Sequence, residues 1–388
     1  MKKKLQVHDR ELAKKASFYA NRIGKNHNIF KGHAIHSFNG KKLETIFNIP
    51  ILPVPKIFDI VRTGYDQAFV DFLQDFKILL SEKKHIYLSF VNTTVTNLPV
   101  FLLLYEIQDK YNCKISVIWS KKSPFVNKLI KDSGAFSPKA ERNQAMFNPK
   151  IKRIPVISGS NQEYQTFPDA LVDAIRDKFY DGDIPDNIES RISQAVIETL
   201  ENVGRHAYPD QPLDKDKKWW LVCSIGHNGN EKEEYMYLAI FDSGRGIPLS
   251  FEDSKVFQNR VKKHYPEEFS KLLHGEIEDN SKLGQLTKLV RTAKSMIAPL
   301  RNTIGDSGLI HASMMHDMTS LDDDSHGQGS VSIKDIVTTD ADSKLIILSN
   351  SGCYQYNKGG KEEHTRIELQ NELSGTLLQW SIKLDELC

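Results

Sequence analysis

A carboxylate and a carboxamide four residues apart are the first side chains in this sequence that could do chemistry. Glu198 and Asn202 lie in the segment DNIESRISQAVIETLENVGRHAYP, whose apolar residues recur at helical spacing. Residues four apart project side by side from a helix. An amide oxygen suits Mg²⁺, which keeps most of its waters, and a carboxylate can orient or deprotonate a water. The pair predicts a Mg²⁺–phosphate site, with a solvated polar helix face as the alternative.

The second feature is an abrupt change of residue type where an expected strand ends. Tyr235–Phe241 is apolar and aromatic, and Asp242, Gly244 and Gly246 follow it. A carboxylate at a strand end can accept a hydrogen bond from an exocyclic amine, and glycines let backbone approach a flat ring. The pattern indicates a base-binding turn. The alternative is an ordinary strand-to-helix turn with an aspartate cap.

The third feature is a glycine-led helix in the segment SHGQGSVSIKDIV. Gly327 and Gly329 precede its apolar positions, and His326 and Lys334 add positive charge nearby. Glycines at a helix start expose backbone N–H groups and the positive end of the dipole, which together hold phosphate. The segment matches neither a Walker loop nor a dinucleotide fingerprint. A flexible capping loop is the alternative.

Several elements must position these residues. Asp186 and Glu189 form a capping-box-like start for the helix that carries Glu198 and Asn202. The remaining elements of this half are two strands, a turn and a closing strand entered through Gly375 and Thr376: Lys344–Ser349, Cys353–Tyr356, Lys358–Lys361 and Ser374–Leu384.

The order of these parts resembles the GHKL (Bergerat-fold, histidine-kinase-like) ATPases. A helix with E-x-x-x-N, a strand ending in D-x-G-x-G, a glycine-led helix and a Gly-Thr strand follow one another over residues 185–385. The wording ETLENVGRHAYP is most similar to the anti-sigma-factor kinases. The resemblance implies an α/β (α+β) sandwich at residues 186–388 with a mixed sheet. It also implies that ATP and Mg²⁺ are bound beneath a long lid at about residues 247–330.

The resemblance also implies a role for each site residue. Asn202 would ligate Mg²⁺, and Glu198 would activate a water or position a kinase substrate. Asp242 would bind the adenine amine, and Gly244 and Gly246 would shape the adenine pocket. Four further residues would lie near the nucleotide: Gly327 and Gly329 at the phosphates, Thr376 on the adenine side, and Arg205, for which a surface role is the alternative.

The sequence departs from the family in its lid. Ser330 stands where a leucine usually follows the second lid glycine, and the stretch Ile247–His326 is long. A second glycine pair, Gly305 and Gly308, is set aside because the helix-then-strand order continues from Gly329. The expected helices of this stretch are Gln258–Leu273, Leu286–Met296 and a lid helix within Ile304–Ser320.

The N-terminal half alternates strands and helices over residues 36–145 and resembles a STAS-like α/β domain. Its expected elements are a helix with apolar spacing from Phe69 to Leu80, a strand Ile86–Val91, a helix Leu98–Tyr105, a strand Lys114–Trp119 and a helix Phe125–Ile130 that stops near Gly134. Residues 146–185 are rich in Pro, Gly, Asn and Asp. We expect them to form a connector containing one helix, Phe167–Phe179.

Residues 1–35 form a basic arm. Nine Lys and Arg against Asp9 and Glu11 give this segment a local charge of +7. Such an arm can touch nucleic acid or an acidic partner. A solvated helix over a domain edge is favoured, because no aromatic residues are interleaved with the charges.

The bulk composition excludes several classes of protein. The net charge of +2 over 388 residues creates no global field for nucleic acid or membrane. Four cysteines without a CxxC pair suit a reducing cytoplasm. No apolar run approaches the ~18 residues of a membrane helix, and no signal peptide follows the basic start. His33 and His36 lack a partner with metal-ligand spacing.

These features predict an ATP-driven conformational switch. ATP and Mg²⁺ would order the lid, the N-terminal domain would respond, and slow hydrolysis with Glu198 as base would reset the state. One alternative is a Ser/Thr protein kinase acting on a STAS-like partner, and another is a nucleotide sensor without catalysis. We expect a protein partner and, by analogy with the family, a homodimer.

Overall fold

The computed structural model describes residues 36–38, 40–227, 233–250, 263–267, 297–315, 329–338 and 340–384. The expected basic arm, His33 and Gly327 lie outside these residues, as do Leu286–Met296 and most of Gln258–Leu273. Within the described residues, no helix is long and apolar enough to cross a membrane.

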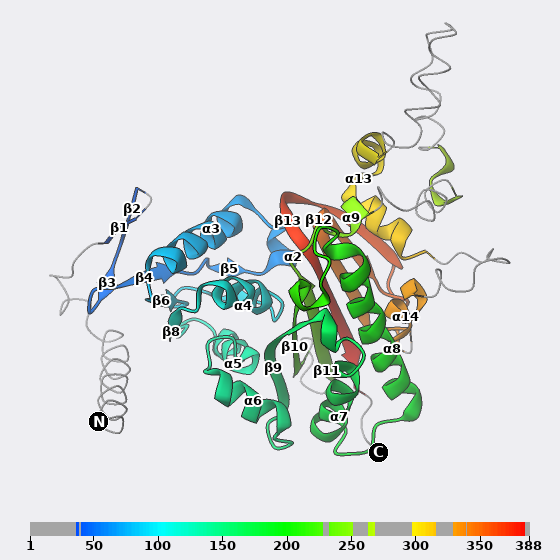
Figure 1. The fold of residues 1–388 in the computed structure, drawn as a ribbon, viewed down its shortest axis with the longest axis horizontal. Coiled ribbons are helices and arrows are strands. Elements are labelled where there is room, and N and C mark those ends of the chain that lie inside the picture. Colours follow the sequence, from blue (N-terminus) through cyan, green and yellow to red (C-terminus); the bar gives the residue numbers. More distant parts are fainter. Residues whose placement is uncertain are drawn as a thin grey trace, which may run out of the picture.

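The N-terminal half is a mixed, mostly parallel sheet covered by helices (Figure 1). Its strand order is β3-β4-β6-β8, in which β4, β6 and β8 run parallel and β3 is antiparallel to β4. The strands are β3 (Thr45–Ile46), β4 (Ile49–Pro53), β6 (His85–Ser89) and β8 (Lys114–Ile118). The helices are α2 (Ile60–Thr63), α3 (Gln67–Glu82), α4 (Val100–Tyr111), α5 (Pro124–Ser133) and α6 (Lys139–Phe147). Two short ribbons complete this half: β1 (His36–Phe38) with β2 (Lys41–Leu43), and β5 (Ile57–Phe58) with β7 (Val95–Thr96).

Local sequence explains where these helices begin and end. The Asp66 carboxylate caps α3 by accepting from the Phe69 backbone N–H at 2.9 Å, and Ser123 caps α5 in the same way. Gly134 ends α5 in the left-handed conformation (φ +59°), as glycine at this position predicts. The expected alternation of strands and helices over residues 36–145 is confirmed.

The C-terminal half is a five-stranded sheet in the order β12-β13-β11-β10-β9. Its strands are β9 (Arg153–Ser160), β10 (Lys218–His227), β11 (Glu234–Asp242), β12 (Lys344–Tyr356) and β13 (His364–Lys383). Every neighbouring pair is antiparallel, so the expectation of a mixed sheet is wrong. Two of the four pairs, β10–β11 and β12–β13, are hairpins, which pair antiparallel, whereas parallel pairing needs a crossover.

Strand β9 comes from the segment expected to be a connector. Pro155 lies inside it, and proline is tolerated here because β9 is the edge strand of the sheet. The expected helix in the same segment is confirmed as α7 (Phe167–Phe179). The connector residues thus supply an edge strand and a covering helix to the C-terminal sheet.

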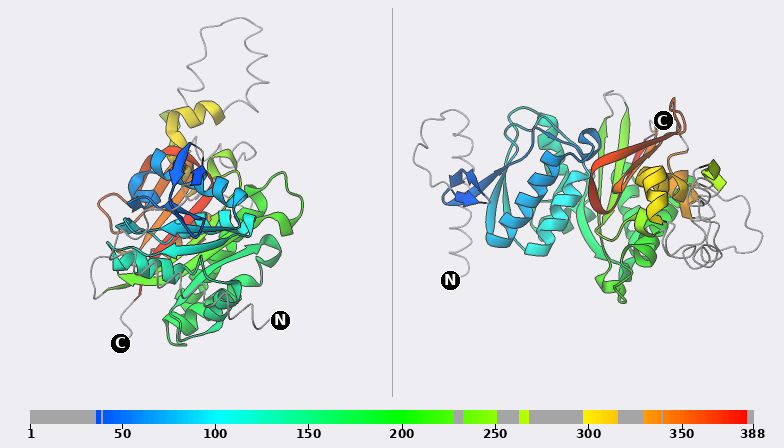
Figure 2. Two further views of the ribbon diagram at one scale, coloured as in Figure 1. Left: turned by 90° about the vertical axis from the view of Figure 1, so that its left-hand side faces the viewer. Right: turned by 90° about the horizontal axis from the view of Figure 1, so that it is seen from above.

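The C-terminal sheet is buried on both faces. One face, with Trp220, Val222 and Phe241, shares a single core with α3, α4 and α5 of the N-terminal half. The other face, with Leu238 and Ile240, packs against α7, α8 (Asp186–Asn202) and α14 (Gly329–Asp335). Figure 2 (right) shows this sheet between the blue and cyan N-terminal half and the green, yellow and orange helices.

Helix α8 confirms the expected amphipathic stripe, with Ile192, Ala195, Val196 and Thr199 buried. The capping box is wrong, however. Asp186 is already the first helical residue, and Pro185 occupies the N-cap position, where no side chain caps the helix.

The hairpin β12–β13 is longer than expected. The strands expected at Lys344–Ser349 and Cys353–Tyr356 are one irregular strand, whose register shifts between Ser349 and Gly352. The distal part of the hairpin carries helix α13 (Ile297–Ser313), seen at the top of Figure 1 beside β12 and β13. The expected lid helix overlaps α13 but begins later than it does.

Candidate functional site

Asp242 ends β11 on the face of the sheet that packs against α7, α8 and α14, in alternation with Leu238 and Ile240. It is 5% exposed, and its register partner on β13 is Thr376. The carboxylate accepts from the backbone N–H of Gly244 at 2.9 Å and from that of Thr376. Burial raises the pKa of Asp242 to about 7 because no cation offsets the desolvation. No residue in the described part of the chain forms an ion pair with it.

The glycines after Asp242 are required by close packing. A Cβ on Gly244 would lie 2.4 Å from the Ala207 carbonyl oxygen. Gly246 has φ +88°, and a Cβ there would lie 2.3 Å from Asn350 Oδ1. The turn is therefore held between the chain after α8 on one side and β12 on the other.

Sequence reasoning missed a buried polar cluster beneath this turn. Ser349 Oγ donates to the Gly375 carbonyl at 2.9 Å, accepts from the Ile247 backbone N–H at 2.9 Å, and lies 3.1 Å from Thr376 Oγ1. Asn350 Nδ2 donates to the Arg245 carbonyl at 3.1 Å, while Asn350 Oδ1 is buried without a donor among the described residues. Such an unmatched acceptor costs stability unless a ligand or water meets it.

Glu198 and Asn202 lie one turn apart near the end of α8, both half-buried. Asn202 Nδ2 donates to Glu198 Oε1 at 3.3 Å, which leaves Asn202 Oδ1 as an acceptor. Burial and the neighbouring Glu201 raise the pKa of Glu198, and the Arg205 guanidinium opposes the rise. A carboxylate with a raised pKa is a stronger base than an exposed one.

A π-helical turn joins these two halves of the candidate site. Val203–Ala207 continues α8, and the Arg245 backbone N–H donates to the Ala207 carbonyl at 2.8 Å. The Tyr208 hydroxyl donates to the Lys218 carbonyl at 2.7 Å and accepts from the Ser243 backbone N–H at 3.1 Å. Ala207 is the residue that contacts the glycine turn, and it follows Asn202 by five helical residues, or roughly 7 Å of rise. π-turns of this kind are frequent at functional sites.

Two other expected site residues, Gly329 and Arg205, lie outside the glycine turn. Gly329 is the first residue of α14, which packs along α8 through an Arg191–Asp335 ion pair of 3.0 Å. Arg205 is exposed and pairs with Glu201 at 2.8 Å. The structure thus brings together Asp242, Gly244, Gly246 and Thr376, and links them to Asn202 and Glu198.

The set-aside glycine pair has a structural role. Gly305 (φ +71°) kinks α13, and the buried Asp306 that follows binds the Arg301 guanidinium at 2.5 and 2.6 Å. The same carboxylate accepts from the Ser351 backbone N–H at 2.8 Å. This segment therefore fastens α13 to the hairpin β12–β13.

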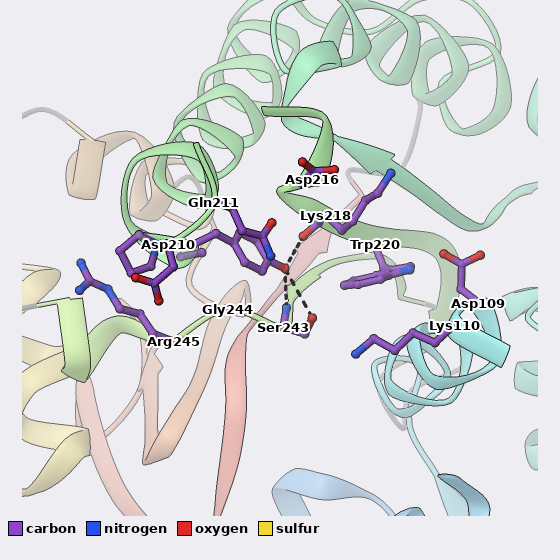
Figure 3. A pocket seen from close by; sticks show the side chains of 13 residues that line it. Asp109, Lys110, Asp210, Gln211, Asp216, Lys218, Trp220, Ser243, Gly244 and Arg245 are labelled. Atoms are coloured by element: carbon purple, nitrogen blue, oxygen red, sulfur yellow. Dashed lines mark hydrogen bonds between the residues drawn. The ribbon is translucent and has the colours of Figure 1, made fainter. Parts of the chain in front are cut away.

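A pocket of about 560 Å³ lies between the glycine turn and the end of α4 in the N-terminal half (Figure 3). Asp109 and Lys110, at the end of α4, face Trp220, Ser243 and the start of β10 across it. Its lining includes Gly244, but none of the other expected nucleotide residues. By strand alternation Asp242 lies on the face of Leu238 and Ile240, whereas Trp220 belongs to the core on the other face.

Among the described residues, no three His, Cys, Asp or Glu side chains are grouped to hold a metal ion. A Mg²⁺ ion at Asn202 would therefore depend on oxygens that a nucleotide brings with it. Comparison of the chain with protein-family models gives no match, and comparison with curated proteins gives none either.

Proposed function

We propose that the C-terminal half binds ATP with Mg²⁺ and acts as a conformational switch that slow hydrolysis resets. The observation that carries this proposal is a pair of buried acceptors at the glycine turn whose capacity for hydrogen bonds the described residues do not fill. Asp242 is a buried carboxylate without an ion pair among the described residues, and Asn350 Oδ1 is a buried acceptor without a donor there. Both costs are offset when a ligand donates hydrogen bonds to them.

The chemistry of this end favours adenine. Two of the roughly four lone-pair positions of the Asp242 carboxylate are used by backbone N–H groups, so the rest can accept from an exocyclic amine. Adenine presents an amine at the position where guanine presents a carbonyl oxygen. A carboxylate facing that carbonyl would be repelled, so the proposal includes a preference for ATP over GTP.

The end of α8 supports the phosphate side of the proposal. Asn202 Oδ1 is oriented by the bond from Nδ2 to Glu198 and would join the coordination of Mg²⁺, which would neutralise phosphate charge when bound. Glu198 lies beside Asn202 and has a raised pKa, which suits a base that activates water. Glu201 points elsewhere, because it is engaged by Arg205.

A route from the glycine turn to the lid side supports switching. Asn350 Nδ2 donates both to the Arg245 carbonyl and to Glu372 Oε1, each at 3.1 Å. Glu372 also pairs with Arg301 of α13 at 3.4 Å. A change at the turn therefore reaches α13 through one asparagine and one glutamate.

Strand β13, which carries Glu372, also contacts the N-terminal half. The Gln370 backbone N–H donates to the Gly64 carbonyl at 2.9 Å, and Asn371 Nδ2 donates to the Tyr65 carbonyl at 2.9 Å. Two residues earlier, Glu368 Oε1 accepts from the Ser307 backbone N–H of α13 at 2.9 Å. Strand β13 thus touches α13 and the end of α2 within five residues, so the lid-side helix and the N-terminal half can move together.

The test uses calorimetric titration of Mg·ATP into the full chain, followed by phosphate-release assays. Asn202→Ala should weaken Mg·ATP binding about tenfold or more, through loss of a metal ligand. Glu198→Gln should keep affinity within about threefold and lose phosphate release, through loss of the base. Asp186→Asn is the matched control, since it removes an exposed carboxylate at the opposite end of the same helix. Equal binding and turnover in all these proteins would remove the proposal.

If the chain binds ATP, the fate of the label from γ-³²P-ATP distinguishes hydrolysis, phosphotransfer to protein and binding without turnover. Free labelled phosphate supports the hydrolytic switch. Label on protein supports the kinase alternative instead, and intact ATP that binds without turnover supports the sensor.

A further inference from the structure

The carboxyl ends of the parallel strands β4, β6 and β8 meet in one set of connected loops. The Thr94 backbone N–H donates to the Lys56 carbonyl at 2.8 Å, and the Lys121 backbone N–H donates to that of Val91 at 3.3 Å. Ser120 Oγ donates to the Thr93 carbonyl at 2.7 Å. This edge of a parallel sheet is where ligands generally bind in α/β proteins.

The loop after β8 is held rigidly. Asn127 Oδ1 accepts from the Ser120 backbone N–H at 2.8 Å, and its Nδ2 donates to the Ser120 carbonyl at 2.9 Å. Ser120 Oγ also accepts from the backbone N–H groups of Lys122 and Ser123, each at 3.0 Å. A loop fixed in this way loses little entropy when a ligand binds it.

This loop displays aromatic rings and lysines to solvent. Trp119 is 48% exposed and Phe125 is 52% exposed, and the double hydrogen bond between Ser120 and Asn127 closes the short segment that carries Phe125 next to Trp119 in the chain. We call five exposed aromatic and basic residues of this edge the carboxyl-edge patch: Lys56, Trp119, Lys121, Lys122 and Phe125.

The charge of the carboxyl-edge patch is uncompensated. In the part of the chain that the structure describes, no carboxylate pairs with Lys56, Lys121 or Lys122. The segments 54–59, 90–99 and 119–123, which include β5 and β7, contain one acidic residue, Asp59. Its carboxylate already caps α2 and accepts from Asn97 Nδ2 at 2.8 Å. The patch therefore has positive charge beside exposed flat rings.

We propose that the carboxyl-edge patch binds single-stranded nucleic acid. Unpaired bases would stack on Trp119 and Phe125, while the lysines would contact the phosphates. A duplex keeps its bases stacked inside and cannot use the rings, so single strands are preferred. The partner would not be an acidic protein segment, because carboxylates need the lysines but not two exposed rings. This surface is separate from the proposed nucleotide site, and neither proposal depends on the other.

The test is fluorescence anisotropy of a labelled dT₂₀ oligonucleotide with the full chain at 50 mM salt. Wild type should bind dT₂₀ about tenfold more tightly than a duplex of equal length. Trp119→Ala and Phe125→Ala should each weaken binding on the order of tenfold. Lys121→Ala with Lys122→Ala should lower the slope of log affinity against log salt by about 1.4, which corresponds to two phosphate contacts.

The matched control is Phe147→Ala with Lys150→Ala, which removes an exposed ring and a lysine at the end of α6. It should bind dT₂₀ like wild type. The basic residues of 1–35 are present in every protein, so differences among variants report on the patch alone. Absence of dT₂₀ binding by wild type overturns the proposal. So does equal loss in the control, binding of poly-glutamate in place of dT₂₀, or binding that the ring substitutions leave unchanged.

Discussion

Replacing Asp242 by asparagine should make the protein more stable at alkaline pH and lower its affinity for ATP. The carboxylate is buried with a pKa of about 7, against 3.8 for an ordinary aspartate. The folded protein therefore holds this proton more tightly than the unfolded chain does. Stability falls as pH rises from about 4 to about 7 and stays low above that range. Asparagine removes this pH dependence.

The size of the effect follows from the shift. A difference of about three pKa units, at 1.36 kcal/mol each, costs the ionised wild-type fold about 4 kcal/mol at pH 8. Asparagine avoids that cost but leaves one of the two backbone N–H groups without its acceptor, a loss of about 1–2 kcal/mol. The net gain is about 2–3 kcal/mol, or roughly 3 °C in melting temperature for a cooperative unit of this size. At pH 5 the two terms cancel, and the melting temperatures should coincide.

The assay combines thermal unfolding at pH 5 and pH 8 with ATP titration at pH 8. Asp242→Asn should bind ATP at least about tenfold more weakly, because its amide can present N–H groups where an acceptor is needed. Asp216→Asn makes the same charge change at an exposed residue and should alter neither property. The reasoning is refuted if Asp242→Asn melts no higher than wild type at pH 8 and binds ATP equally well.

Two further substitutions examine the hairpin β12–β13. Glu372→Ala cuts the contacts to Asn350 and Arg301, so ATP affinity should stay within about threefold while ATP no longer changes hydrogen exchange in α2. Glu362→Ala, in the hairpin turn, should leave that response intact, and a normal response in both variants would exclude the route. Gly375→Ala combines φ +95° with a Cβ 1.9 Å from the Asp242 carbonyl oxygen. It should lower the melting temperature by more than Gly182→Ala does, because Gly182 has φ +96° and no atom within 4 Å of the added Cβ. Equal decreases in melting temperature would mean that backbone strain, and not the clash, causes the loss of stability.

Residue type and period were enough to predict the elements that carry the candidate site. The stripe through Ile192 and Val196 predicted α8, and the change at Asp242 predicted the end of β11. These features are local, because helical period and strand-ending turns depend on neighbours in sequence. Pro155 and Gly159 obscured β9, because both residues usually mark turns. An edge position, which only the assembled sheet defines, makes Pro155 acceptable there, and Gly159 leaves room for the Trp219 ring.

Strand direction and the polar cluster under the glycine turn could not be predicted. Ser349 and Asn350 meet Gly246 because the register of β12 shifts at this point, and register is set by long-range pairing. Tyr208 connects the turn to β10 through its hydroxyl, a contact between residues far apart in the chain. Ser349 and Asn350 have no motif of their own, so only the folded arrangement identifies them.

The shared burial of the C-terminal sheet ties the fate of the two halves together. A truncated chain that begins after α6 would present Trp220, Val222 and Phe241 to water on an otherwise intact sheet. An apolar surface of that kind promotes self-association. The halves should therefore melt as one cooperative unit, and a protease cut between them would release neither as an independent folded piece.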